Sequence, residues 1–168
     1  MTTVPGPPPL DLAFRGAMRR LASGVAIVAT SDGEGRPRGI AMTAFMSLSM
    51  EPPSLLLAVN RSASLCEPLV ARGRFSVNIM AWEDAAACHA FVFAPADERF
   101  SAIGWERDEG GLPIIPSAVA NILCHIDQAE PFGSHMIIRG VVEKVVLGES
   151  RAPLAYVDGR YGRISFDG

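Results

Sequence analysis

Six hydroxyl side chains lie between residues 42 and 64, in sequence that is otherwise strongly apolar. Serines that alternate with Met46, Leu48 and Met50 are typical of a strand with one buried face and one face of small hydrogen-bond donors. Such donors, together with backbone N–H groups, suit the phosphate of an anionic ligand. A serine-rich loop between two barrel strands would have the same composition, so this stretch alone leaves both interpretations open. The six residues are Thr43, Ser47, Ser49, Ser54, Ser62 and Ser64.

Familiar catalytic motifs are missing from the rest of the sequence. There is no G-x-G-x-x-G, P-loop or G-x-S-x-G segment, and no His or Cys has metal-ligand spacing, so we expect no metal site. The three cysteines, Cys66, Cys88 and Cys124, are expected to be small buried hydrophobic residues in a reducing cytoplasm.

One of the three histidines stands out. His89 is expected to be packed or on the surface, and His125 to face water or a partner subunit. His135 follows Phe132-Gly-Ser134 at the start of the longest predicted strand, and sites are often built where loops meet strand ends. His135 is therefore the candidate catalytic residue.

The bulk composition excludes several classes of protein. The net charge is −3 and Lys144 is the sole lysine, which argues against nucleic-acid binding. The length of 168 residues predicts one domain, and 49% hydrophobic residues favour an oligomer. We expect residues 1–9 to form a flexible arm without signal-peptide features and residues 10–168 to form a single cytoplasmic domain.

The elements that must position these side chains are mainly strands. Strands do not alternate regularly with helices, so the order predicts an antiparallel barrel with peripheral helices rather than a doubly wound sheet. Helices are predicted over 10–22, with Asp11 as cap, over 64–72, with Ser64 as cap and Gly73 as stop, and over 84–93. Strands are predicted over 25–30, 37–42, 47–50, 54–60, 74–80, 118–127 and 135–147, with an irregular segment over 99–111 and a turn over 130–134.

Several segments, in order along nearly the whole chain, resemble the flavin reductase family with a split-barrel, FMN-binding-type fold. This family comprises the small reductase components of two-component flavin monooxygenases. The matching segments are Phe14-Arg15 with Arg20-Leu-Ala-Ser-Gly-Val25, Met42-Thr-Ala-Phe with Ser47-Leu-Ser49 and Pro52-Pro53, Val59-Asn-Arg-Ser-Ala-Ser64, Gly73-Arg-Phe-Ser-Val-Asn78, Arg99-Phe100, Trp105, Gly133-Ser-His135, and Pro153-Leu with Tyr156 and Tyr161.

The resemblance implies a mainly β, Greek-key split barrel and a homodimer that binds FMN or FAD at the subunit boundary. It implies an NAD(P)H:flavin oxidoreductase that takes hydride from NADH or NADPH and supplies reduced flavin to a separate monooxygenase. By the same resemblance, Thr43 and Ala44 would contact the isoalloxazine edge and Asn78 with Ile79 would line the ring. His135 would lie beside the flavin and the incoming nicotinamide.

The resemblance also implies a phosphate side of the site. Hydroxyl groups would hold the phosphate or ribityl chain there, and Arg99-Phe100 would close over it. The residues so assigned are Ser47, Ser49, Ser62 and Ser64, with Leu48 and Asn60 in the same segments and Tyr161 approaching the cleft from the C-terminal stretch.

Two positions depart from the family pattern, and two other functions stay open. Ser64 stands where Thr is common, and Ser134 stands where Asp is frequent, which leaves His135 less cationic. A non-catalytic flavin- or haem-binding protein of the same barrel type is the main alternative. The second alternative is a flavin enzyme that acts directly on a small substrate.

Overall fold

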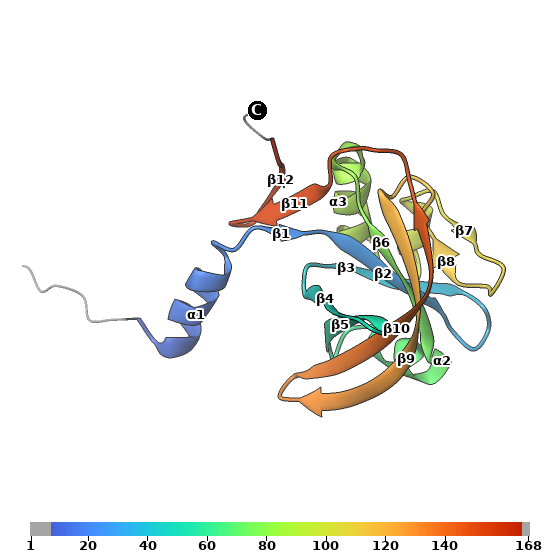
Figure 1. The fold of residues 1–168 in the computed structure, drawn as a ribbon. Helices are drawn as coiled ribbons and strands as arrows, with labels where there is room; N and C mark the ends of the chain where they lie inside the picture. The colour runs from blue at the N-terminus through green and yellow to red at the C-terminus, as the bar shows by residue number, and fades with distance from the viewer. Residues whose placement is uncertain (1–7, 166–168) are drawn as a thin grey trace, which may run out of the picture.

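The computed structural model describes residues 8–165, and the chain folds into one strongly curved sheet with helices at its margins (Figure 1). The helical elements are α1 (Leu10–Met18), α2 (Cys66–Arg72), α3 (Ala85–Phe93) and the 3-10 turns η1 (Trp82–Asp84) and η2 (Arg99–Ser101). The strands are β1 (Ser23–Gly24), β2 (Ala26–Ser31), β3 (Pro37–Met42), β4 (Phe45–Met50), β5 (Pro53–Asn60), β6 (Arg74–Ile79), β7 (Glu106–Arg107), β8 (Pro113–Ile114), β9 (Ala120–Phe132), β10 (His135–Leu147), β11 (Leu154–Val157) and β12 (Arg160–Arg163).

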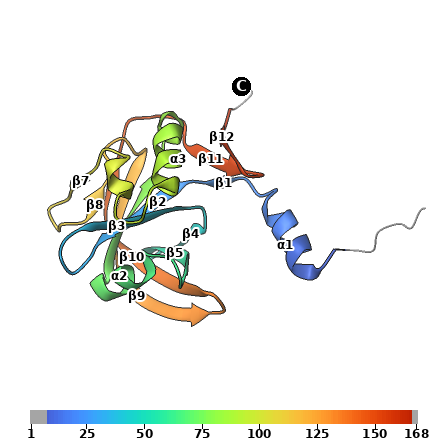
Figure 2. The same ribbon diagram turned by 180° about the vertical axis from the view of Figure 1, so that it is seen from behind.

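The main sheet has seven strands in the order β3-β2-β6-β9-β10-β5-β4, and every pair in it is antiparallel. This arrangement confirms the predicted antiparallel fold class. The two edge strands, β3 and β4, follow each other in the chain, and the curvature brings them near one another (Figures 1 and 2). The linker between them, at Thr43 and Ala44, thus lies where the sheet is split.

The hydrophobic core lies on both faces of β2, where all six residues are buried. Ala26 and Val28 pack in a cluster with Leu57, Phe75 and α2. Because side chains alternate along a strand, Ile27 and Ala29 enter a second cluster, built with α3 and η2. β2 is therefore the rigid centre of the fold, and it holds β3 and the site beside β3 in place.

The ends of helices α1 and α2 and the length of the β9–β10 turn differ in part from the sequence prediction. α1 ends at Met18, and neither Asp11 nor Ser64 caps a helix with its side chain. Gly73 does end α2, in the left-handed conformation with φ 69°. The β9–β10 turn is the two-residue Gly133-Ser134, tighter than predicted, because Phe132 pairs directly with His135.

A small three-stranded sheet, β1-β11-β12, adjoins α1, and none of its strands was predicted. The backbone N–H of Asp158 in its turn donates to the carbonyl of Arg19 at 2.7 Å, and the two side chains pair at 3.4 Å. No residue of α1 is buried, and the helix projects from the body of the molecule in both ribbon views (Figures 1 and 2).

Most of the expected arm over residues 1–9 lies outside the described residues. Within residues 8–165, no helix has the length and apolarity to cross a membrane. The same part of the chain contains no cluster of potential metal ligands.

Candidate functional site

The loop that follows β5 is a rigid turn beside the start of β10. Oδ1 of Asn60 accepts hydrogen bonds from the backbone N of Ser62 at 2.9 Å and from its hydroxyl at 2.8 Å. The backbone N of Arg61 donates to the carbonyl of Ser134 at 2.9 Å, and Asn60 pairs with His135 in the sheet. The fold therefore brings three predicted site residues, Asn60, Ser62 and His135, to one end of the β5–β10 pair.

Arg99 comes to the same end of the sheet from η2. Its Nη1 donates to the carbonyl of Gly39 at 3.0 Å and lies 3.5 Å from the hydroxyl of Ser64. Its Nε is buried without a hydrogen-bond partner in the described part of the chain. A guanidinium with an unused donor beside two exposed serine hydroxyls, those of Ser62 and Ser64, is suited to bind a phosphate.

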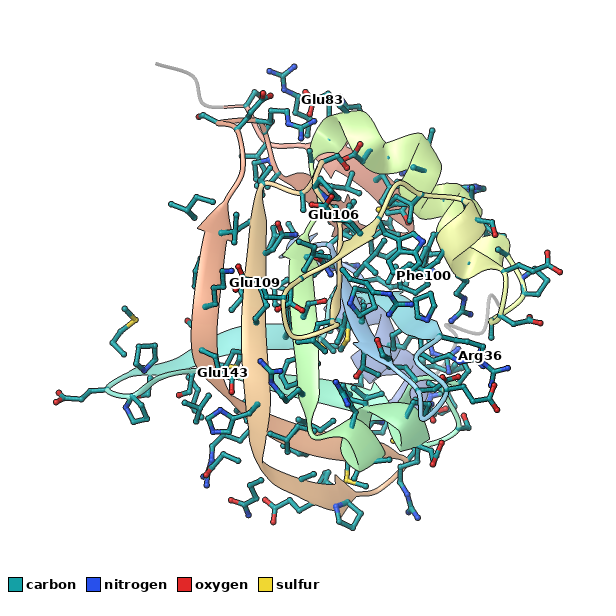
Figure 3. All side chains as sticks on the ribbon, turned by 90° about the vertical axis from the view of Figure 1, so that its right-hand side faces the viewer. Arg36, Glu83, Phe100, Glu106, Glu109 and Glu143 are labelled. Atoms are coloured by element: carbon teal, nitrogen blue, oxygen red, sulfur yellow. The ribbon has the colours of Figure 1, made fainter. Side chains whose placement is uncertain are left out.

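Phe100 packs in the core next to Arg99 and so fixes the position of Arg99. Its ring packs edge-on against Phe91 and Trp105, at centroid distances of 5.2 and 5.5 Å, and Figure 3 shows it turned into the interior. A Cβ at residue 39 would lie 3.0 Å from the Phe100 ring, so Gly39 allows η2 to approach β3 closely. Phe100 is thus a core residue that positions Arg99 rather than an exposed part of the site.

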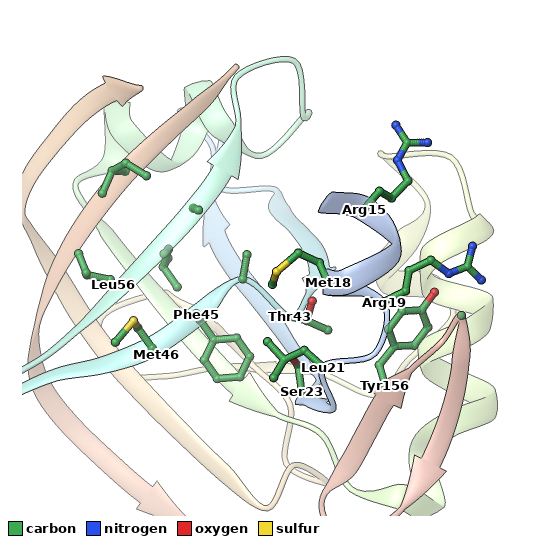
Figure 4. Close-up of a pocket in the computed structure, with 15 residues that line it drawn as sticks. Arg15, Met18, Arg19, Leu21, Ser23, Thr43, Phe45, Met46, Leu56 and Tyr156 are labelled. Atoms are coloured by element: carbon green, nitrogen blue, oxygen red, sulfur yellow. The ribbon is translucent and has the colours of Figure 1, made fainter. Parts of the chain in front are cut away.

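A large apolar cavity of about 780 Å³ lies between α1 and the outer face of β4, β5 and β10. Thr43 and Ala44 line it, and Figure 4 shows Met18, Thr43 and Phe45 around the same space. The carbonyl of Ala44 accepts from the backbone N of Ala58 at 3.0 Å, two residues before Asn60. The apolar cavity therefore ends close to the polar loop 60–64.

A second, polar groove of about 440 Å³ reaches Ser64 from the other side. The β2–β3 turn forms one wall and the start of α2 forms the other. Its lining residues are Asp32, Gly33, Glu34, Arg36, Arg38, Ala63, Ser64, Glu67 and Pro68. Ser64 thus lines the charged groove, whereas Thr43 and Ala44 line the apolar cavity.

His135 is half-buried at the rim of this site. Its Nδ1 lies 2.9 Å from the hydroxyl of Ser134, so this serine holds the ring in place. The other two histidines lie elsewhere: His89 is exposed and stacks on Phe93, and His125 lies 3.2 Å from Glu143.

The first half of the serine-rich stretch lies apart from the loop 60–64. Ser49 pairs with Ser54, six residues along β5 from Asn60, which corresponds to about 20 Å. Its hydroxyl accepts from the backbone N of Glu51 at 3.0 Å. Ser47 and Leu48 lie on the same exposed edge strand, so the structure does not bring these three residues to the phosphate end within one chain.

Asn78 is inside the molecule, which corrects the expectation that it would line a ligand. It is fully buried, its Nδ2 donates to Ile27 and Ser76, and its Oδ1 accepts from Ile115 and Asn121. All its hydrogen-bonding capacity is used to join β2, β6 and β9. Ile79 is half-buried on the same strand and lines neither cavity.

Tyr161 is half-buried on β12, where its ring packs against Tyr156, at a centroid distance of 5.6 Å. Burial raises the pKa of Tyr161, with smaller contributions from Cys88 and Tyr156. Tyr156 itself lines the apolar cavity, so Tyr161 supports that cavity's wall from behind.

Sequence reasoning missed most of the cavity walls. Met18 and Leu21 lie within the predicted helix over 10–22, and Arg38 lies within the predicted strand over 37–42, but none of them was identified as a site residue. The helical spacing of the apolar residues in α1 indicates that this helix covers another surface, whereas no local pattern identifies Arg38. Arg38 is held by Asp32, across the β2–β3 turn.

Comparisons with known proteins are consistent with one family. The profile described as "Flavin reductase like domain" matches residues 18–165. The reductase component of 4-hydroxyphenylacetate 3-monooxygenase from Thermus thermophilus is 38% identical over 152 residues, covering 90% of this chain and 95% of that protein. The reductase component of an FADH(2)-dependent resorcinol hydroxylase from Rhizobium sp. is 36% identical over 150 residues, covering 88% and 84%.

Solved structures agree with this result. The NADH:FAD oxidoreductase of Streptomyces globisporus C-1027, in complex with NAD and FAD fragments, has a TM-score of 0.87 at 26% identity and covers 99% of both chains. A flavin reductase complexed with NADP+ has a TM-score of 0.83 at 28% identity and covers 92% of this chain and 98% of that one.

Proposed function

The chain belongs to the flavin reductase-like family, and from this premise we propose the reaction that its site carries out. It is an NAD(P)H-dependent flavin reductase that transfers hydride from NADH or NADPH to FMN or FAD. The reduced flavin then serves a separate monooxygenase component. Relatives named as reductase components and as NADH-dependent FMN reductases support this function over a non-catalytic flavin- or haem-binding protein.

The observation that carries the proposal is the polar loop beside Arg99. The flavin phosphate binds to the hydroxyl of Ser64 and to the guanidinium of Arg99, whose Nη1 lies 3.5 Å from that hydroxyl. A hydroxyl and a guanidinium side by side supply hydrogen-bond donors for an anionic oxygen. The isoalloxazine ring extends from there toward Thr43 and Ala44, at the end of the apolar cavity.

Hydride moves from C4 of the nicotinamide to N5 of the flavin, and the two rings must stack face to face for this transfer. The chain's contribution is to bind both rings in one orientation and to exclude water. Ala44 and Ala58 present small side chains on the wall of the apolar cavity, which leaves room for two stacked rings. His135, held by Ser134, orients the nicotinamide at the rim, and no general acid or base is required.

We also propose that the working unit is a homodimer in the cytoplasm. Large apolar residues are exposed on α1 and on β4, among them Phe14 at 64% and Met50 at 83%. A second copy of the chain would cover them. The three free, buried cysteines fit a reducing compartment.

An anaerobic reduction experiment tests the reaction itself. The purified chain is mixed with NADH, or with NADPH, and excess FMN or FAD, and the flavin absorbance is followed. We expect catalytic bleaching of many equivalents of flavin. Flavin that stays oxidised while bound to the chain would instead favour the binding-protein alternative.

A further inference from the structure

We propose that Met18 and Met46 are modification sites, and that dioxygen converts them to methionine sulfoxide when it reacts with reduced flavin in the apolar cavity. This inference rests on the proposed function and goes beyond it, because it concerns what the product of that reaction does to the chain itself. Both residues line the apolar cavity, Met18 from α1 and Met46 from β4 (Figure 4). Thr43 and Ala44, toward which the isoalloxazine ring extends, line the same cavity.

The positions of these two residues set them apart from the other methionines. Among the methionines in residues 8–165, Met18 and Met46 alone line the apolar cavity. Their exposed fractions are 47% and 59%, so both side chains are accessible from the cavity. Met50 is more exposed, at 83%, but it lies at the end of β4 and lines no part of the cavity, and Met80 is fully buried. Exposure to solvent and contact with the cavity therefore rank the methionines in different orders.

Reduced flavin and dioxygen together supply an oxidant that a thioether accepts. The reduced flavin gives up two electrons and two protons, and the methionine sulfur gives up two electrons. These electrons break the O–O bond: one oxygen atom forms the S–O bond of the sulfoxide, and the other leaves with the two protons as water. The flavin returns to its oxidised form, and the step needs no further reactant.

The reaction is confined to the cavity because the oxidant forms at the flavin ring. Peroxide in solution oxidises methionines according to their exposure, and it would favour Met50. An oxygen atom that is transferred while the flavin is still bound reaches only the side chains beside the ring. The unbranched methionine side chain has three rotatable bonds, so the sulfur atoms of Met18 and Met46 can approach the ring without a movement of the backbone.

A sulfoxide changes the surface that holds the ring. It places a polar oxygen on walls that are otherwise formed by apolar side chains, such as those of Leu21, Phe45 and Leu56. A polar group that is buried without a hydrogen-bond partner opposes binding of an apolar ring. The modification therefore weakens flavin binding when reduced flavin is lost to dioxygen, and a methionine sulfoxide reductase reverses it. The two methionines limit the formation of reduced flavin that no monooxygenase consumes.

Mass spectrometry after aerobic turnover tests the proposal. The chain is incubated with NADH, FMN and catalase under dioxygen that carries a heavy oxygen isotope, and fragment ions locate the label at each methionine. A parallel sample without flavin receives hydrogen peroxide, which measures how accessible each methionine is in the assembled protein. We expect the ratio of label at Met18 and Met46 to label at Met50 to be severalfold higher after turnover than after treatment with peroxide.

Ser64→Ala is the matched control, because it weakens flavin binding from outside the apolar cavity. At half-saturating FMN it should slow the labelling of Met18 and Met46 during turnover and leave their oxidation by added peroxide unchanged. The FMN affinity of the unaltered chain should fall severalfold after turnover and recover after treatment with methionine sulfoxide reductases. Met18→Leu combined with Met46→Leu removes both acceptors, so turnover should not change the FMN affinity of that variant.

Two results would overturn the proposal. One is turnover that leaves Met18 and Met46 without label, or that labels the methionines in the same ratio as added peroxide, because the oxidant then acts from solution. The other is an FMN affinity that stays unchanged once both residues carry oxygen. Photochemically reduced FMN, supplied without NADH before dioxygen is admitted, separates this inference from the proposed function. Label at both residues with this flavin, but not with NADH and oxidised FMN, would refute the reductase reaction and leave the inference intact.

Discussion

Ser64 and Ser49 belong to the same serine-rich stretch but have different surroundings. Ser64 lies beside Arg99 at the junction of the two cavities, whereas the hydroxyl of Ser49 bonds to the backbone of Glu51. We expect Ser64→Ala to weaken binding of both flavins by about 1–3 kcal/mol, because it removes a donor to a charged group. Ser49→Ala is the matched control, and its flavin affinity should equal that of the unaltered chain.

Flavin titrations at fixed ionic strength check this prediction. If Ser49→Ala weakens binding and Ser64→Ala does not, the phosphate lies at the far end of β4, and the assignment of Arg99 is wrong. This residue pair also shows the limit of sequence reasoning. The alternation of hydroxyls identified both serines, but the length of β5 places Ser49 about 20 Å from Asn60, where the loop that carries Ser64 begins.

His135 is expected to act on the nicotinamide rather than on folding. It is half-buried at the rim, and its ring is held by the neighbouring Ser134. His135→Ala should raise the KM for NADH, with the midpoint of thermal unfolding within about 2 °C of the unaltered chain. Stopped-flow reduction at several NADH concentrations measures this effect. A large fall in thermal stability with unchanged kinetics would show instead that the ring is structural.

Asn78 is the residue whose environment could not be read from the sequence. An asparagine in a strand with Phe75 and Val77 is compatible with a ligand-facing position or with a buried one. The structure shows four internal partners for its side chain, from β2, β6, β9 and the segment before β9. Those partners come from separate segments of the chain, so no local sequence pattern identifies them.

At the scale of elements, α1 has too little contact with its own chain to be stable alone. A nine-residue helix is marginal in water, and none of its residues is buried. Phe14 and Met18 are 64% and 47% exposed. We expect Phe14→Glu combined with Met18→Glu to convert the proposed dimer to a monomer, because the charges oppose burial of this face in a second copy.

Light scattering during gel filtration measures that change. The control is Val70→Glu on α2, where Val70 is 41% exposed on a helix outside this apolar surface. The control variant should stay dimeric. A monomeric unaltered chain, or a helix variant that remains a dimer, would contradict the proposed role of α1.

The elements that the sequence predicted well are those with strong local patterns. β9 and β10 follow long apolar alternations, and α2 ends at Gly73 in the left-handed conformation that glycine tolerates. β1, β11 and β12 were not predicted as strands because each has at most four residues. These strands are stabilised by pairing with each other and by contact with α1. The sequence of a short segment does not reveal such pairing.

At the scale of the whole molecule, two buried thiols make stability depend on alkaline pH. Desolvation, with a smaller contribution from Asp84, raises the pKa of Cys88 to about 12. Desolvation, with a smaller contribution from Glu143, raises the pKa of Cys124 to about 12 as well. The unfolded chain ionises near the ordinary value of 9.0. A raised native pKa stabilises the fold below pH 9, and this contribution is lost as pH rises from 9 toward 12.

Denaturant unfolding between pH 8 and 11 should therefore show a decreasing free energy of unfolding. Each thiol contributes a slope of up to about 1.4 kcal/mol per pH unit. Cys88→Ala should lower overall stability through the cavity it leaves, and it should also reduce the slope. The double variant Cys88→Ala with Cys124→Ala should show the smallest slope, and an unchanged slope in it would refute this cause.

The sequence thus predicted the fold class, because the fold class depends on local alternation and on a resemblance spread over the whole chain. It could not place the walls of the site. The apolar cavity joins α1 to strands more than twenty residues away, and the groove depends on Asp32 reaching across a turn to Arg38. The contacts across the cavity form only when the sheet curves, and the Asp32–Arg38 contact forms only when the β2–β3 turn closes.

Steady-state oxidation of NADH at increasing concentrations of free FMN, and separately of free FAD, tests the central claim most directly. We predict turnover that saturates with each flavin. We also predict that gel filtration separates the flavin from the chain between experiments. The contrary result is a chain that retains its flavin through gel filtration and oxidises no NADH when either free flavin is added.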